Sequence, residues 1–204
     1  GDQQPDGLIG IDMFQNLCGQ HQLPPRRRRF GIKIGEINHY KRMAAFAGPY
    51  KQGIELGLEE ANASGGVLNK KIEFIFRDDQ GKPGEAVKIA EELMTRDGAV
   101  MITGTILSHV GLAISSLAGE KGYVYLASEP LADSIVWAKG NKYTYRLRTS
   151  TFMQAAMLAE EAAKTDAKRF ATIAPNYAYG KDAVAAFKQN RLKLRPDAEF
   201  VAEQ

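Results

Sequence analysis

Ser108 is the residue with the clearest potential for binding chemistry. It precedes Val110, Ala113, Ile114 and Leu117, whose spacing predicts the buried stripe of a helix. A serine hydroxyl at the start of a helix, together with the N–H groups of the first turn, favours a bound carboxylate. The alternative is that Ser108 serves only as the N-cap of that helix, which is a common use of serine.

Other reactive side chains do not form a catalytic pattern. His39 and His109 have no nucleophile or acid–base partner at a recognisable spacing. The pair Asp78-Asp79 is more typical of a turn after a strand than of metal ligands. The sequence has no GxxxxGK[ST] motif and no GxGxxG after its first strand, so nothing indicates a bound nucleotide. We therefore expect a protein that is not an enzyme and that uses no metal and no cofactor.

The charge distribution excludes a broad nucleic-acid surface. The formal net charge is +3, and the arginines at positions 26–29 stand against Asp2, Asp6 and Asp12 in the same stretch. The remainder of the chain is close to balanced, so we expect no nucleic-acid partner. No apolar run reaches the length of a membrane span. Cys18 is the only cysteine, which excludes an internal disulfide and a multi-cysteine metal site.

Residues 1–29 differ in composition from the rest of the chain. They are rich in Gln, Gly, Pro and Asp and show no helix or strand period, which predicts an irregular, disordered leader. A basic arm is the weaker alternative. No intact export signal is visible. A further hypothesis is that the Pro/Arg tract is a signal peptide translated in a shifted frame, because CGC arginine codons read one base later become GCC alanine codons.

From residue 30 the sequence alternates strand and helix patterns. Pro49 is expected in the first turn of one helix, with Ile54, Leu58 and Ala61 buried, and further helices are expected to begin at Pro83 and at Ser108. This βαβ alternation with short connections predicts an α/β fold, a Rossmann-like parallel sheet with helices on both faces. The expected strands are 31–35, 71–77, 99–103 and 123–126, followed by an extended segment 143–148 and a second, shorter series with strands 169–174 and 199–202 and helices 151–165 and 181–193.

Several segments in this order resemble one known family. The opening strand 32–37, the helix end at 60–66 and Arg77-Asp78-Asp79 are similar to type I periplasmic binding proteins for branched-chain amino acids. So are Gly104 to Ser108, the segment 145–149 and the motif Asn-Tyr-Ala-Tyr-Gly at 176–180. The resemblance implies two Rossmann-like lobes joined by three crossing strands, with the ligand held between the lobes.

The resemblance also implies a division of this chain. Residues 30–144 correspond to the first lobe, 145–149 to the first hinge crossing and 150–204 to an incomplete second lobe. It further implies a periplasmic solute-binding component of an ABC importer, which delivers a small-molecule ligand to a membrane permease. The ligand is expected to be a branched-chain amino acid or a related small carboxylate or amide. A cytosolic amide or amino-acid sensor of the same fold is the alternative.

The ligand is expected at the carboxyl ends of the strands. In the resembled family a serine at the position of Ser108 binds the ligand carboxylate, and we include Leu107 beside it. Phe46 matches an aromatic residue that packs on the ligand, and Tyr179 matches a tyrosine of the second lobe. In the family a threonine of the loop after the fourth strand contacts the ligand ammonium, and Leu131 stands at about that position here. The candidate substitutes are Ser128 and Glu129.

Overall fold

The computed structural model describes residues 31–204, so the expected leader and the frameshift hypothesis lie outside the described residues. Five parallel strands form one sheet in the order β2-β1-β3-β4-β5, and β6 and β7 form a separate parallel pair. The strands are β1 (Ile32–Asn38), β2 (Ile72–Asp78), β3 (Met101–Gly104), β4 (Tyr125–Ala127), β5 (Thr144–Arg146), β6 (Arg169–Thr172) and β7 (Glu199–Glu203). This confirms the α/β fold with a parallel sheet.

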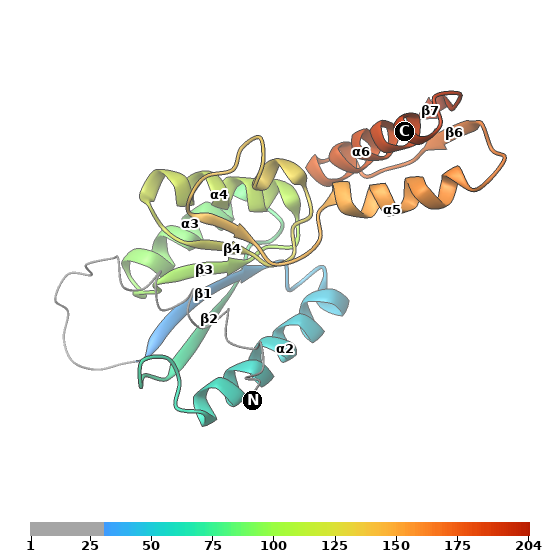
Figure 1. Cartoon of the computed structure of the whole chain (residues 1–204). Coiled ribbons are helices and arrows are strands. Elements are labelled where there is room, and N and C mark those ends of the chain that lie inside the picture. Colours follow the sequence, from blue (N-terminus) through green and yellow to red (C-terminus); the bar gives the residue numbers. More distant parts are fainter. Residues whose placement is uncertain (1–30) are drawn as a thin grey trace, which may run out of the picture. The chain divides into compact units, whose positions relative to one another are not determined.

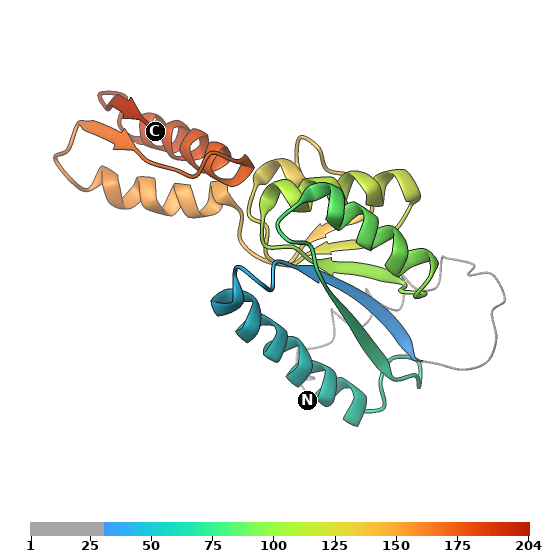
Figure 2. The ribbon, with the colours of Figure 1, turned by 180° about the vertical axis from the view of Figure 1, so that it is seen from behind.

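Helices cover both faces of the five-stranded sheet. Figure 1 shows α3 and α4 on one face and α2 on the other, and Figure 2 shows the same layers from behind. The helices are α2 (Ala44–Ala63), α3 (Pro83–Thr95), α4 (Ser108–Lys121), α5 (Thr151–Ala163) and α6 (Ala178–Leu194), with a short 3₁₀ turn η1 (Asp133–Ile135). No helix among the described residues is both long and apolar enough to cross a membrane.

The apolar core lies between the sheet and the layer of α3 and α4. Leu93 of α3, Ile114 of α4 and Ile37 of β1 are buried there. A β-carbon added to Gly35 would lie 2.9 Å from Leu93 Cδ1, so the helix packs directly on the strand backbone. The expected start of α3 at Pro83 is confirmed, and α4 ends at Gly122, which has a φ of 68°.

The expected start of α2 is wrong. The helix begins at Ala44, because the Met43 carbonyl accepts hydrogen bonds from the N–H groups of Phe46 and Ala47. More than one helical turn therefore precedes Pro49. The helix lacks the backbone hydrogen bond that a residue with an N–H group would donate at this position. The expected buried stripe is wrong as well, since Ala47 is the buried residue of this helix and Ile54, Leu58 and Ala61 are only partly buried.

The segment 143–148 is partly a strand of the first sheet. Within it β5 pairs in parallel with β4, and Tyr125 lies opposite Thr144. After residue 148, α5 and α6 pack against each other beside the β6–β7 pair (Figure 1). Phe170, Phe187 and Phe200 form an aromatic cluster on that pair, with ring centroids 5.8–6.1 Å apart. The division into two lobes remains a prediction.

The face of the sheet covered by α2 carries a buried carboxyl group. Glu36 of β1 is 0% exposed and accepts a hydrogen bond from the Tyr40 hydroxyl through Oε2. Its Oε1 has no hydrogen-bond partner among the described residues, and a β-carbon at Gly104 would lie 2.6 Å from it. Burial raises the pKa of Glu36 from 4.5 to about 8, more strongly than the hydrogen bond from Tyr40 lowers it. Glu36 is therefore protonated at neutral pH.

The raised pKa of Glu36 predicts a fold that loses stability in alkaline solution. The folded state holds this proton more tightly than the unfolded state, so the stabilisation present below about pH 4.5 is lost as the pH rises through about 8. Glu36→Gln should reduce the fall in unfolding free energy between about pH 6 and pH 9 by roughly 2–3 kcal/mol, because one pKa unit corresponds to about 1.4 kcal/mol. Urea denaturation at both pH values measures it.

The matched control is Glu59→Gln, on the exposed side of α2. This variant should keep the pH dependence of the original chain. An equal fall in unfolding free energy for Glu36→Gln and for the original chain would show that Glu36 is ionised at neutral pH in the folded state.

Candidate functional site

The carboxyl ends of β1, β3 and β4 meet at one edge of the sheet. In the register of these strands, Ile37 lies opposite Gly104, and Gly104 lies opposite Ala127. The loops that follow the three strands are therefore neighbours in space. This edge is where open parallel sheets bind ligands.

The turn between β3 and α4 has an unusual backbone that fixes the start of the helix. Thr105 has a φ of 61°, and its N–H donates to the Ile37 carbonyl at 2.6 Å. Its hydroxyl oxygen lies 2.5 Å from the hydroxyl of the fully buried Tyr125. A threonine with a positive φ is strained, and these contacts hold it in place.

The expectation that Ser108 is the N-cap of α4 is wrong. Leu107 occupies the cap position, with the extended dihedral angles φ −82° and ψ 123°, and no side chain caps the helix. Its carbonyl accepts the N–H groups of Val110 and Gly111. Ser108 is the first helical residue and is 1% exposed, and its Oγ accepts the N–H of Ala132 at 3.2 Å.

The start of α4 keeps donors available for an anion. The N–H groups of Ser108 and His109 open the helix, so no carbonyl of the helix lies in position to accept them. Because Ser108 Oγ accepts from Ala132, its own proton is left to donate. The helix dipole adds a partial positive charge at the same point. This arrangement can bind a carboxylate.

The loop after β4 is held by two buried polar contacts. Ser128 Oγ lies 2.8 Å from the hydroxyl of Tyr50 on α2, and Glu129 accepts a hydrogen bond of 2.5 Å from Asn38 of β1. Both loop residues are buried, and burial raises the pKa of Glu129. The structure thus gives Ser128 and Glu129 partners within the protein, and contact of either with a ligand remains a prediction.

Two aromatic groups flank this edge of the sheet. Phe46 is 55% exposed and lies one helical turn before Tyr50 on α2, so both occupy the same side of that helix. The ring of Tyr179 lies 6.0 Å from that of Tyr177, which lies 5.3 Å from the ring of His109 on α4. The tyrosine motif at 176–180 therefore reaches the first turn of α4 through Tyr177, a contact that the sequence analysis did not identify.

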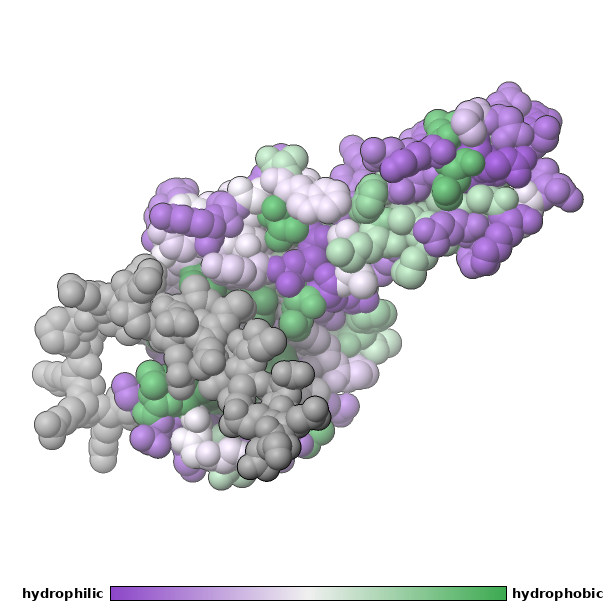
Figure 3. All heavy atoms as spheres, in the orientation of Figure 1, coloured by the Kyte–Doolittle hydropathy of each residue, from purple (hydrophilic) through white to green (hydrophobic). Residues whose placement is uncertain are grey.

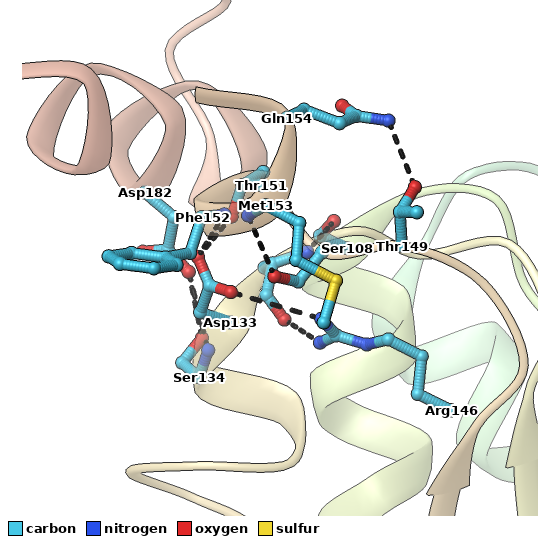
Figure 4. Close-up of polar contacts among 12 residues, drawn as sticks. Ser108, Asp133, Ser134, Arg146, Thr149, Thr151, Phe152, Met153, Gln154 and Asp182 are labelled. Atoms are coloured by element: carbon cyan, nitrogen blue, oxygen red, sulfur yellow. Dashed lines mark hydrogen bonds and ion pairs between the residues drawn. The ribbon is translucent and has the colours of Figure 1, made fainter. Parts of the chain in front are cut away.

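Asp133 makes a further set of contacts that the sequence did not indicate (Figure 4). Its Oδ2 accepts hydrogen bonds from the Thr151 hydroxyl and from the N–H of Phe152, at 2.9 Å for the latter, in the first turn of α5. Arg146 donates to the Ala132 carbonyl, and its Nη1 lies 3.9 Å from Asp133 Oδ1. The loop that carries Ala132 is thus tied to β5 and to α5.

The start of α5 has its own cap. Ser150 Oγ accepts the N–H of Met153 at 3.3 Å. The helix exposes the apolar side chains of Met153, Met157 and Leu158. Figure 3 shows apolar surface along this part of the chain, and exposed apolar surface of this kind is typical of a contact face.

The comparisons agree with this architecture. A family model described as a periplasmic binding protein matches residues 32–199. A Leu/Ile/Val-binding protein homologue from Brucella melitensis is 29% identical over 147 residues, which are 72% of this chain and 39% of that protein. The chain therefore spans about two fifths of the length of this curated relative.

Two solved structures from Rhodopseudomonas palustris are also similar. A solute-binding protein of an ABC transporter from strain BisB5, in complex with 3,4-dihydroxybenzoic acid, has a TM-score of 0.75 and 26% identity, covering 85% of this chain and 46% of that one. An ABC-type branched-chain amino acid transporter protein from strain CGA009 has a TM-score of 0.67 and 31% identity, with the same coverage. Because the family model matches most of its length, the chain belongs to the type I periplasmic binding protein family.

Proposed function

We propose that this chain is part of the solute-binding component of an ABC importer. In this role the protein captures a small carboxylate in the periplasm and presents it to a membrane permease. The names of the relatives support the proposal, because they describe amino-acid-binding proteins and transporter components. They give no support to a cytosolic sensor, and they favour a role without catalysis.

The observation that carries the proposal is the start of α4. Ser108 opens this helix at the carboxyl edge of the sheet, with its hydroxyl proton left to donate and with N–H groups of the first turn beside it. A carboxylate satisfies these donors and the helix dipole together. The neighbouring Leu107 offers an apolar contact to the same ligand.

The relatives differ in the body of the ligand but share its carboxylate. One is named for leucine, isoleucine and valine, and another is described with 3,4-dihydroxybenzoic acid. Phe46, Tyr177 and Tyr179 offer aromatic surfaces suited to either an aliphatic or an aromatic body. The ligand class we propose is therefore a small carboxylate, with an amino acid or an aromatic acid as its two forms, and Ser128 and Glu129 as candidate contacts.

The proposed two-lobe mechanism predicts weak binding by the 204-residue chain expressed alone. Affinity in hinge-closing proteins comes from burial of the ligand between two lobes, and this chain spans less than half of the solved relatives. Calorimetry with leucine and with 3,4-dihydroxybenzoate should therefore give dissociation constants of about millimolar or weaker, and the complete protein should bind one of the two more tightly. Micromolar binding by the 204-residue chain would contradict a cleft between two lobes.

Ser108→Ala in the complete protein tests the carboxylate site. The change removes the donor to the ligand, so affinity should fall by roughly 1–3 kcal/mol, the range for a hydrogen bond to a charged group. Ser116→Ala is the matched control, because Ser116 is an exposed serine on the same helix. Phe46→Ala should weaken binding to a similar degree through lost apolar contact. Unchanged affinity for Ser108→Ala would leave Ser108 with only its contact to Ala132.

A further inference from the structure

A histidine and two carboxylates come together where β1 and β2 end. Asn38 and Asp78 lie opposite each other in the register of these strands, so His39 and Asp79, which follow them, emerge at the same edge of the sheet. The sequence alone favoured a simple turn for Asp78-Asp79. In the structure one ligand-type atom from each of His39, Asp78 and Asp79 lies within 4.8 Å of the other two.

The contacts within this cluster are too long to be hydrogen bonds. His39 Nδ1 lies 3.6 Å from Asp79 Oδ1 and 4.0 Å from Asp78 Oδ1, whereas N–H···O hydrogen bonds span about 2.7–3.2 Å. His39 Nδ1 and Asp79 Oδ2 have no hydrogen-bond partner within residues 31–204. His39 is 6% exposed and Asp79 is 0% exposed. Buried polar atoms without a partner are costly and uncommon, which points to a missing ligand.

The backbone holds the two carboxylates in position. Asp79 Oδ1 accepts the N–H of Gly81 at 2.7 Å, and Asp78 accepts the N–H groups of Gln80 at 2.7 Å and Lys41 at 2.9 Å. A carboxylate offers about four acceptor positions, so these bonds leave lone pairs on both side chains. The cluster is therefore oriented before any ligand arrives.

We propose that His39, Asp78 and Asp79 bind one divalent transition-metal cation, for which zinc is the best fit. Two carboxylates balance the double charge, and an imidazole ligand favours zinc over calcium or magnesium, which prefer oxygen ligands. A tetrahedral zinc ion with bonds of about 2.1 Å separates its ligands by about 3.4 Å. The separation of 3.6 Å between His39 Nδ1 and Asp79 Oδ1 needs little adjustment.

This cation would join two loops beside the proposed ligand site. His109 Nε2 lies 3.4 Å from the Gly81 carbonyl, and a β-carbon at Gly81 would lie 3.2 Å from Leu107 Cδ1. The loop after β2 therefore contacts both the cap residue and the first turn of α4. Metal binding would stabilise this loop without placing the metal at Ser108.

Calorimetric titration of the untagged full chain with Zn²⁺ tests the proposal. We expect one ion per chain, no binding of Mg²⁺, and affinity at least about tenfold weaker in His39→Gln and in Asp79→Asn, because even the loss of a residue that only orients a metal ligand typically costs about 10–100-fold. His109→Gln is the matched control, because His109 lies beside the cluster but outside it. The double variant Cys18→Ser/His21→Gln removes the single cysteine and the remaining histidine of the sequence, and both controls should bind zinc as the original chain does.

A spectroscopic measurement keeps the test independent of the folding of the variants. Co²⁺ bound by His39, Asp78 and Asp79 should give visible absorption without a thiolate charge-transfer band, because the proposed site contains no cysteine. A charge-transfer band, zinc binding that disappears in the Cys18/His21 variant, or no zinc binding by the original chain would overturn the proposal. In those cases His39, Asp78 and Asp79 are neighbours without a bound metal.

Discussion

The segment from Ser128 to Asp133, directly after β4, is the part of the molecule on which the arrangement of the candidate site depends. Each neighbouring element holds it by a polar contact. The loop therefore links α2, β1, α4 and α5 in addition to the apolar core that β1 shares with α4. The contacts are Tyr50 to Ser128, Asn38 to Glu129, Ala132 to Ser108, and Asp133 to the first turn of α5.

Buried polar contacts can fix the position of this loop because they are directional. An apolar face packs in several ways at similar free energy, whereas a buried carboxylate that loses its donor suffers the full cost of desolvation. Glu129 and Ser128 are both buried and both paired. The position of the loop is therefore specified within the chain, and the first turn of α4, which is bonded to it, is specified with it.

The sequence was informative where a structure follows from neighbouring residues. Pro83 starts α3 and Gly122 ends α4 because a fixed φ and a positive φ, respectively, are local properties. The start of α2 could not be found in this way. Its first turn is set by the Met43 carbonyl and not by a capping side chain, and Pro49, a common helix starter, lies farther along.

The contacts of the site were harder to foresee because their partners are far apart in the chain. Asn38 and Glu129 are separated by 91 residues, and Tyr50 and Ser128 by 78. One signal was present, since the polar Glu36 and Asn38 stand close to the apolar Ile34 and Ile37 in one short strand. Such residues need buried partners, but only the fold shows which ones.

The central claim is that the start of α4 binds a carboxylate, and backbone amide NMR of the 204-residue chain tests it most directly. Millimolar 3,4-dihydroxybenzoate is compared with catechol, which has the same ring without the carboxylate. The account predicts that the amide signals of Ser108 and His109 shift with the acid and remain unchanged with catechol. Equal shifts with both compounds, or shifts that leave the first turn of α4 unaffected, would contradict it.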